Sequence, residues 1–357
     1  MKAIVLTPAR ATRVASVFAF TVILATLVGL PAGASAGDQI RADGSAGSSA
    51  GANTGGGTRT GAGASADADS GRCSLWIDLY TGEPTSFTDI LDDLHQVRVI
   101  YLGEGHTLER HHRIQADVVN GLADRGDTLV LGLEMLETYM QPEVDRYWKG
   151  EIPFDTLAAR VNWSKRWGNY AQYREPMEAA RRRGFPILAL NARREVVHQV
   201  GMEGLEKLPA EDRAQLPAEI VFNQPMYEAQ MNTVLQVHAK AMGMPGLLQT
   251  MYQAQVVRDE TMANTLAEFL KSDAGRGRRA IVILGAGHCQ QGMGTPSRVR
   301  RRIPGITDRI IVMSQSGDVE LSEAERMLAS GVEITHAQLG HLQAPLADYL
   351  HVMNLRP

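Results

Sequence analysis

The sequence predicts an α/β fold: a mostly parallel sheet flanked by helices, with a helical subdomain inserted before the second of two signature strands. The signature strands are β-branched apolar runs, residues 97–106 and 279–288, and each ends in Gly-x-Gly-His. Apolar runs bounded by glycine are typical of strands buried on both faces, as in a parallel sheet. Further strand-like runs alternate with helical patterns, which favours the same fold class.

Composition narrows the range of functions. The chain has 357 residues and a formal net charge of -4, and it contains no long basic run, so we expect no nucleic-acid partner. Its two cysteines are Cys73 and Cys289. They form no C-x-x-C motif for zinc or redox chemistry and no C-x-x-C-H motif for covalent haem. The sequence leaves open whether they pair with each other.

The N-terminal region is typical of an export signal followed by a tether. Residues 1–36 combine a positively charged start, an apolar run over 14–30 and an Ala-Ser-Ala cleavage site at 34–36. We therefore expect an exported, periplasmic protein, tethered to the membrane if the signal stays uncleaved. Residues 37–72 are rich in Gly, Ser and Ala and predict a disordered linker. The folded domain is expected over 73–357.

The order of the elements follows from hydrophobic periodicity. A helix with Ile114, Val118 and Leu122 on one face follows the first signature strand. A long helical region covers about 194–271, and we assign its helical subdomain to about 195–272. Strands are predicted at 97–106, 128–135, 185–191, 279–288 and 309–313, with a short edge strand at 348–353.

Polar side chains follow four of these strands where each one ends. They are Glu104 with His106, Glu134, Asn191 and His288. Parallel strands end at one edge of the sheet, where ligands bind in open α/β folds. We expect His106 and His288 to form two sides of one crevice, joined by Glu134 and Asn191 from strands between them. The signature glycines are expected to let the chain turn sharply there.

This set of side chains suits more than one chemistry. Glu104, His106, Glu134 and His288 are plausible ligands of a divalent metal ion. The same four side chains could instead act as general acids and bases in hydrolysis. A third interpretation is that each of them only caps a helix or binds a loop amide.

Two helices are expected to add residues to the site. His111 and Gln115 are one helical turn apart and face the same way, whereas His112 points elsewhere. One of the two histidines should therefore face the crevice. Further along the chain, the spacing of Gln255, Asp259 and Met262 favours a helix face that looks into the site.

An aromatic cluster lies between the second and third predicted strands. Trp163, Trp167, Tyr170 and Tyr173 fall within a short stretch of a chain in which only 6% of residues are aromatic. Such a group either covers a flat ligand or belongs to the core.

These motifs together resemble the ChaN family of haem-binding proteins. The resemblance rests on six short sequence motifs that occur in the same order over roughly residues 95–315. They are Gly103-Glu104-Gly105-His106, His111-His112-x-x-Gln115, Leu131-Gly132-Leu133-Glu134-Met135, Leu190-Asn191-Ala192-Arg193, Gln255-x-x-x-Asp259-x-x-Met262-Ala263 and Gly285-Ala286-Gly287-His288. The chain also resembles the wider group that contains Tiki proteases, TraB proteins and erythromycin esterases.

The resemblance implies haem bound at a dimer interface, tyrosine and histidine as axial ligands, and a role in iron acquisition with membrane uptake components as partners. Tyr139, Tyr227 and Tyr252 are the candidate tyrosines. The residues expected to contact haem are His106, His111, Asn191, Arg193 and His288, with Arg193 or Arg298 pairing with propionates. ChaN proteins are typically lipoproteins, and this signal lacks the lipid-bearing cysteine. The wider group implies the alternative, a metal-dependent hydrolase that uses Glu104, His106, Glu134 and His288.

Overall fold

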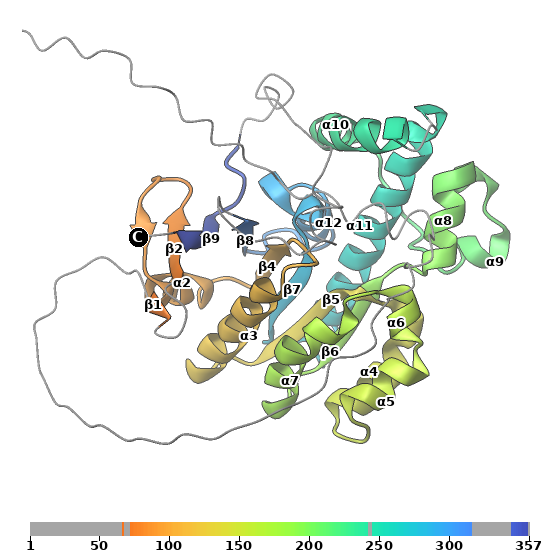
Figure 1. Ribbon diagram of the computed structural model, residues 1–357. Helices are drawn as coiled ribbons and strands as arrows, with labels where there is room; N and C mark the ends of the chain where they lie inside the picture. The colour runs from red at the N-terminus through yellow and green to blue at the C-terminus, as the bar shows by residue number, and fades with distance from the viewer. Residues whose placement is uncertain (1–65, 68–71, 242–244, 316–343, 356–357) are drawn as a thin grey trace, which may run out of the picture.

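The computed structural model describes residues 66–67, 72–241, 245–315 and 344–355 (Figure 1). The predicted signal over 1–36 lies outside these residues, as does most of the predicted linker over 37–72. A two-residue strand, β1, falls within that linker range. Within the described part of the chain, none of the helices combines the length and apolarity needed to cross a bilayer.

Nine strands form a single sheet in the described residues. Their order is β1-β2-β9-β8-β4-β7-β5-β6, with β3 paired to β2. The strands are β1 Ala66–Asp67, β2 Arg72–Asp78, β3 Pro84–Thr85, β4 Val99–Glu104, β5 Leu129–Glu137, β6 Ile187–Asn191, β7 Arg279–Gly285, β8 Asp308–Gln315 and β9 Tyr349–Leu355.

The strands from β9 to β6 are all parallel, so the predicted fold class is confirmed. β4 and β7 are direct neighbours, and β5 and β6 follow on the far side of β7. The prediction that Glu134 and Asn191 come from strands between the two histidines is therefore wrong. Sequence order does not reveal that β7, the fourth of the predicted strands, inserts between β4 and β5.

The predicted edge strand over 348–353 is β9, and it lies inside the sheet rather than at its edge. β2 pairs antiparallel along the outer side of β9, with Leu75 opposite Val352. The strand β2 is not among those that the sequence pattern predicts. Because β2 begins the domain and returns to pair with its last strand, no local pattern marks the contact.

Eleven helices are described around the sheet. They are α2 Phe87–Leu94, α3 Glu109–Asp124, α4 Gln141–Trp148, α5 Phe154–Arg160, α6 Trp163–Arg166, α7 Arg174–Arg182, α8 Arg194–Glu203, α9 Ala210–Arg213, α10 Pro225–Ala241, α11 Leu248–Lys271 and α12 Thr295–Arg302. Short 3₁₀ turns are η1 Thr138–Met140, η2 Tyr170–Tyr173, η3 Leu205–Lys207, η4 Pro245–Leu247, η5 Ala286–His288 and η6 Gln290–Gly292.

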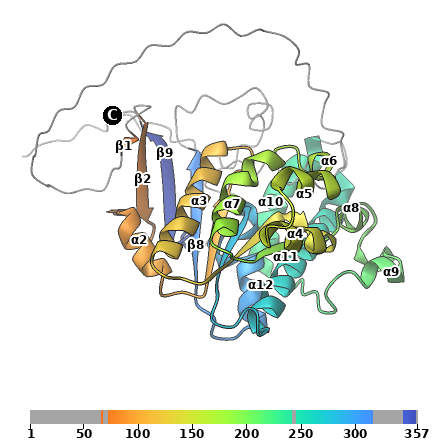
Figure 2. The same cartoon turned by 90° about the horizontal axis from the view of Figure 1, so that it is seen from below.

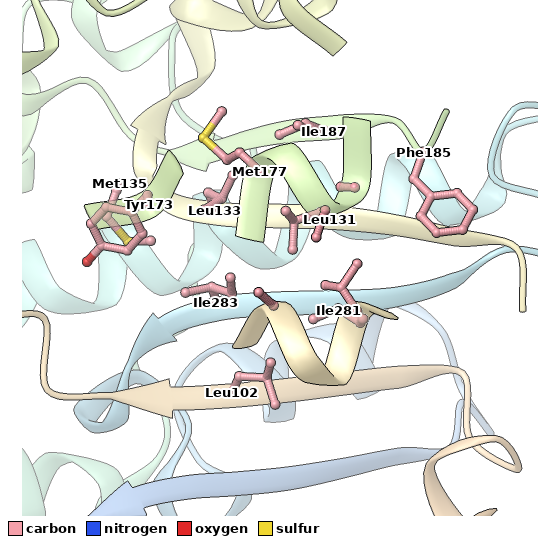
Figure 3. Close-up of a cluster of buried hydrophobic side chains, with 14 of the residues drawn as sticks. Leu102, Leu131, Leu133, Met135, Tyr173, Met177, Phe185, Ile187, Ile281 and Ile283 are labelled. Atoms are coloured by element: carbon pink, nitrogen blue, oxygen red, sulfur yellow. The ribbon is translucent and has the colours of Figure 1, made fainter. Parts of the chain in front are cut away.

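The sheet separates two hydrophobic clusters, as alternating side chains require. On one face Leu102, Leu131 and Ile283 pack with Met177 of α7, as Figure 3 shows. This face is covered by α2, α3 and α7, and α3 and α7 lie side by side (Figure 2). On the other face Tyr101 and Val282 pack against α11 and α12.

All described elements between Arg194 and Lys271 are helical, as predicted. α8, α9 and α10 lie at the end of the molecule away from α2 and β2 (Figures 1 and 2). The 24-residue helix α11 packs against α8, α12 and β6. It thereby carries side chains of the helical region to the carboxyl ends of the strands.

Candidate functional site

The site begins with a histidine–carboxylate pair at the end of β4. His106 Nδ1 lies 2.8 Å from Glu104 Oε1, and both side chains are buried. A carboxylate at Nδ1 orients the imidazole and directs Nε2 to the opposite side. The edge of the His106 ring packs against Trp167, with ring centroids 4.9 Å apart.

Glu104 is fully engaged by its neighbours. The Tyr173 hydroxyl donates to Oε1 at 2.5 Å, and the Gln115 amide donates to Oε2. His112 Nδ1 lies 3.3 Å from the same Oε2. A carboxylate with four polar partners has little capacity left to activate water, so the geometry favours a positioning role for Glu104.

The placement of the two α3 histidines differs from the prediction. His112, not His111, shares the site with Gln115, and its Nδ1 lies 3.1 Å from Gln115 Oε1. Residues three apart are neighbours on a helix as readily as residues four apart, which explains the error. His111 is also buried, but its Nδ1 accepts a hydrogen bond from the Gly105 amide at 3.1 Å.

Glu134, near the carboxyl end of β5, joins the two signature histidines. Its Oε1 lies 3.8 Å from His106 Nε2 and 3.4 Å from His288 Nε2. Its Oε2 accepts a hydrogen bond from the Gly285 amide at 2.7 Å. The guanidinium of Arg258 also donates to Oε1. Both signature strands therefore meet at one buried carboxylate.

The second histidine–carboxylate pair involves α11, as the spacing on that helix predicts. His288 Nδ1 lies 2.8 Å from Asp259 Oδ1 and 3.0 Å from Gln255 Nε2. The hydroxyl of Tyr227 donates to the other Asp259 oxygen. Met262, the third residue of the predicted face, belongs to the core cluster against the sheet instead.

The signature glycines serve close packing and not the sharp turn that we expected. None of the four signature glycines adopts the left-handed backbone conformation that favours glycine. A Cβ on Gly285 would lie 2.7 Å from His106 Nε2, and one on Gly103 would lie 2.8 Å from Cys289 Sγ. Glycine is therefore needed so that the two strand ends and His106 can approach one another. Cys289 is buried with a free thiol.

Neighbouring groups of opposite charge shift the pKa values of the buried carboxylates and of His288. Burial alone would raise the pKa of Glu104, but His112 and His106 hold it well below the usual range. Burial alone would also raise the pKa of Glu134, but His288 and Arg258 keep this pKa well below its usual range. For His288, burial would lower the pKa, yet Glu134 and Asp259 raise it. The site thus favours the ionised forms of both carboxylates and the charged form of His288.

We expect protonation of His111 to lower the stability of the folded protein at acidic pH. Burial lowers its pKa to about 3 although the Glu104 carboxylate acts in the opposite direction. Protonation of Nδ1 would also break the hydrogen bond from Gly105. The unfolded chain takes up the proton first, so stability should fall as pH drops below about 6.5, by about 1.4 kcal/mol per pH unit from this group.

A His111→Asn variant should lose less stability than the parent between pH 6.5 and 4.5, because its amide oxygen replaces Nδ1 without titrating. Urea unfolding at both pH values measures the difference. His198→Asn, at a partly exposed histidine on α8, should behave like the parent. An unchanged pH dependence in His111→Asn would show that His111 does not set it.

A polar pocket opens beside this network at the carboxyl edge. It encloses about 350 Å³, including space open to solvent. That volume is at the lower end for small-molecule pockets. Neither His106 nor His288 lines this pocket. The lining is Glu134, Met135, Glu137, Arg166, Trp167, Asn191, Ala192, Arg194, Val197 and Arg258.

The aromatic cluster divides between core and pocket. Trp163 and Tyr173 are fully buried, and the Trp163 indole donates to the Met135 carbonyl at 2.8 Å. Tyr170 packs against the same core cluster. Trp167 alone lines the pocket. The core interpretation therefore describes most of the cluster.

The candidate haem tyrosines are distinguished by exposure. Tyr139 is 47% exposed, whereas Tyr227 and Tyr252 are buried. The guanidinium carbons of Arg166 and Arg193 lie 5.4 Å and 5.5 Å from the centre of the Tyr139 ring. Arg166 also lines the pocket, so Tyr139 lies close to one of the lining residues.

Only one of the two predicted propionate partners is accessible. Arg193 is exposed and lies 3.2 Å from Glu195. Arg298 is completely buried and lies 3.2 Å from the buried Glu260. The prediction for Arg298 is wrong because its position on α12 faces α11 rather than the strand ends.

The described residues do not form a metal centre. Among them, no cluster of three or more His, Cys, Asp or Glu side chains is arranged to hold a metal ion. The two Nε2 atoms do converge on Glu134, but the Arg258 guanidinium already binds that oxygen. The predicted metal set of Glu104, His106, Glu134 and His288 is thus a hydrogen-bonded network.

Arg258 is the main site residue that the sequence pattern did not predict. It lies on α11 one turn after Gln255 and next to Asp259, both of which were singled out. Its buried charge pairs with Glu134, 124 residues away in sequence. A buried arginine on a site-facing helix was the available signal, but its partner is fixed only by the fold.

Together, the fold and site define an α/β protein with a histidine–carboxylate network and a polar pocket at the carboxyl edge of a parallel sheet. The family described as "Haem-binding uptake, Tiki superfamily, ChaN" matches residues 90–299. The chain belongs to this family. No curated protein sequence matches the chain.

The chain is similar to solved structures, and the first of them shows the same fold. "Cofacial heme binding to ChaN of Campylobacter jejuni" is similar with a TM-score of 0.58 and 18% identity, over 79% of this chain and 97% of that chain. A Bacillus cereus protein has a TM-score of 0.40 and 11% identity, over 75% and 92%. A mutant erythromycin esterase in its open conformation has a TM-score of 0.39 and 14% identity, over 67% and 76%.

Proposed function

We propose that this chain is an exported haem-binding protein that serves haem uptake. The observation that carries the proposal is Tyr139, an exposed phenol between two arginines beside the strand-end pocket of a ChaN-family protein. Tyrosine is an established haem ligand, and arginine pairs well with propionate carboxylates. The chain thus offers an iron ligand and counter-charges on one surface.

The other candidate tyrosines do not suit this role. The Tyr227 hydroxyl donates to Asp259 within the buried network, and Tyr252 packs in the core of the helical region. Reaching an external ligand would require either ring to leave its packing. Tyr139 needs no such change, so we assign it as the iron ligand.

The shape of the site suggests how haem is held. The pocket is too small for the macrocycle, so haem would lie across the surface at Tyr139 and leave one face uncovered. An uncovered hydrophobic haem face favours association. The proposal therefore includes a homodimer in which a second copy of the chain covers this face. Arg193 could turn from Glu195 to a propionate at little cost, because exposed ion pairs are weak.

A haem titration followed by absorbance tests the proposal. We expect a Soret band that shifts from that of free haem and saturates at a fixed stoichiometry. A spectrum equal to the sum of protein and free haem would refute haem binding. Sedimentation with and without haem tests the homodimer.

Export and uptake partners form a separate part of the proposal. The predicted cleavage after Ala36 should give a mature protein that begins at Gly37, detectable by mass spectrometry of the periplasmic fraction. A periplasmic protein that retains residues 1–36 would support the uncleaved tether. Recovery in the cytoplasm alone would refute export, and with it the interaction with membrane uptake components.

One observation favours a second candidate function, hydrolysis. His106 and His288 each bind a carboxylate through Nδ1 while their Nε2 atoms face Glu134, an arrangement that can move protons. An ester panel tests this. Hydrolysis that is lost in His106→Gln would support it, and activity equal to the uncatalysed rate would refute it.

A further inference from the structure

Glu195 binds both of the arginines that flank the exposed Tyr139 ring. Its Oε1 accepts from Arg166 Nη1 at 3.0 Å, and its Oε2 accepts from Arg166 Nη2 at 2.8 Å. The same Oε2 accepts from Arg193 Nε at 3.2 Å. The guanidinium carbons of the two arginines lie 5.4 Å and 5.5 Å from the centre of the Tyr139 ring. An internal carboxylate therefore pairs with the positive charges next to the proposed iron ligand.

Arg166 has a second carboxylate partner that holds it in place. A guanidinium can bind one carboxylate along its Nε–Nη2 edge and another along its Nη1–Nη2 edge. Glu137 takes the first edge, at 2.6 Å from Nε and 2.7 Å from Nη2, and Glu195 takes the second. If Glu195 left, Arg166 would stay oriented by Glu137 and would offer its Nη1–Nη2 edge to another carboxylate.

Of these two glutamates, Glu195 is the one that can leave. Its side chain is 56% exposed, against 9% for that of Glu137. It lies in the first turn of α8, at the surface, where the side chain can rotate into water. Exposed ion pairs contribute about 0.2–1 kcal/mol each, so their loss costs little. The hydrogen bonds from Arg166 lower the pKa of Glu195 to about 2, so the group stays ionised at neutral pH.

A haem propionate brings the same chemical group to this place. It ends in a carboxylate, as glutamate does, and arginine binds both in the same bidentate way. The charges of Arg166 and Arg193 are balanced by those of Glu137 and Glu195 in the haem-free protein. A propionate that joined this group would add an uncompensated negative charge, whereas a propionate that replaced Glu195 would keep the balance.

We propose that Glu195 competes with a haem propionate for Arg166 and Arg193. Resting on the proposed function, Glu195 binds the two arginines in the haem-free protein and is displaced when a propionate takes its place. Haem affinity is thereby lower than the two arginines alone would give. This property suits a protein that passes haem on, because the return of Glu195 favours release.

The test compares haem with haem dimethyl ester, which has no free carboxylate, in absorbance titrations. Glu195→Gln removes the charge with almost no change of shape. It should bind haem about three- to tenfold more tightly than the parent, because the competing ion pairs are lost. Its affinity for the diester should equal that of the parent. Haem binding that is unchanged or weaker in Glu195→Gln, or equal tightening for both ligands, would overturn the competition.

Two further variants separate competition from effects of net charge and folding. Glu195→Asp keeps the charge at the helix start but is one methylene shorter, so it should reach the arginines less well and also bind haem more tightly than the parent. Glu203→Gln changes the net charge at an exposed position on the same helix and should bind haem like the parent. Tightening in Glu203→Gln equal to that in Glu195→Gln would show a net-charge effect and contradict the inference.

Arg193→Gln, made in the parent and in Glu195→Gln, gives an independent measure of the competition. In the parent, Arg193 must leave Glu195 before it binds a propionate, so its loss should cost little haem affinity. In Glu195→Gln no carboxylate competes for it, so its loss should weaken haem binding about threefold more than in the parent. Equal losses in the two backgrounds would count against the competition.

The titration of the parent separates this inference from the proposed function. Saturable haem binding by the parent, without tightening in Glu195→Gln and Glu195→Asp, overturns the competition alone. Haem binding by these variants but not by the parent would support it, since Glu195 would then exclude haem. If neither the parent nor the variants bind haem, the competition and the proposed function both fail.

Discussion

Replacing Glu134 by alanine should lower the free energy of unfolding by about 3–5 kcal/mol, the largest loss that we expect from one substitution in this site. The change leaves the buried Arg258 guanidinium without its carboxylate partner, and it removes the acceptor of the Gly285 amide hydrogen bond. It also removes the negative charge of Glu134, which raises the pKa of His288. Urea unfolding of the folded variant measures the loss.

A surface glutamate provides the control for this substitution. Glu143 lies 3.0 Å from Arg160 and 3.5 Å from Arg146, but its side chain is 30% exposed. Glu143→Ala should therefore cost about 1 kcal/mol or less. The double variant Glu134→Leu with Arg258→Met should cost less than the sum of its single changes. Equal losses in Glu134→Ala and Glu143→Ala would contradict the role of Glu134 as the junction of the network.

Replacing Tyr139 by phenylalanine should weaken haem binding by about ten- to a hundredfold, or roughly 1.4–2.8 kcal/mol. The substitution removes only the hydroxyl, so the ring can still pack against Arg166 and Arg193. Any loss of affinity then reports on the iron ligand rather than on the fold. Absorbance titration with haem measures it.

Tyr80 is the matched control. It is 71% exposed and lies in the turn between β2 and β3, at the opposite end of the sheet from the pocket. Tyr80→Phe should bind haem like the parent. If Tyr139→Phe and Tyr80→Phe both retain the parent affinity, Tyr139 is not the ligand.

Much of the fold follows from local sequence pattern. Strands such as β4 and β7 are continuous apolar runs, and α3 places Ile114, Val118 and Leu122 on one buried face. The parallel class follows from their alternation with helices. The order of the strands does not, since the insertion of β7 between β4 and β5 depends on packing among distant segments.

The sequence predicts several of the residues that form the site, but it does not predict how they are arranged. The repeated signature indicated that His106 and His288 belong together, and the helical spacing placed Asp259 near them. Nothing local could show that Glu134 is bound by Arg258, or that both histidines lie beneath the surface beside a pocket they do not line. The contacts of Glu134 with Arg258 and His288 join residues more than a hundred positions apart.

The exposure of Tyr139 likewise emerges only from the fold. In the sequence it is one of nine tyrosines, and it follows a buried strand. The structure places it at the surface between two arginines while it buries the other two candidates. That distinction turns a family resemblance into an assignment to one residue.

The central claim is that Tyr139 ligates haem iron at the carboxyl edge of the sheet. Resonance Raman spectroscopy of the haem complex, with ring-labelled tyrosine, tests it most directly. We predict iron-phenolate bands that shift with the label in the parent and in Tyr80→Phe and that are absent from Tyr139→Phe. Bands that persist in Tyr139→Phe, or a parent complex without them, would contradict the claim.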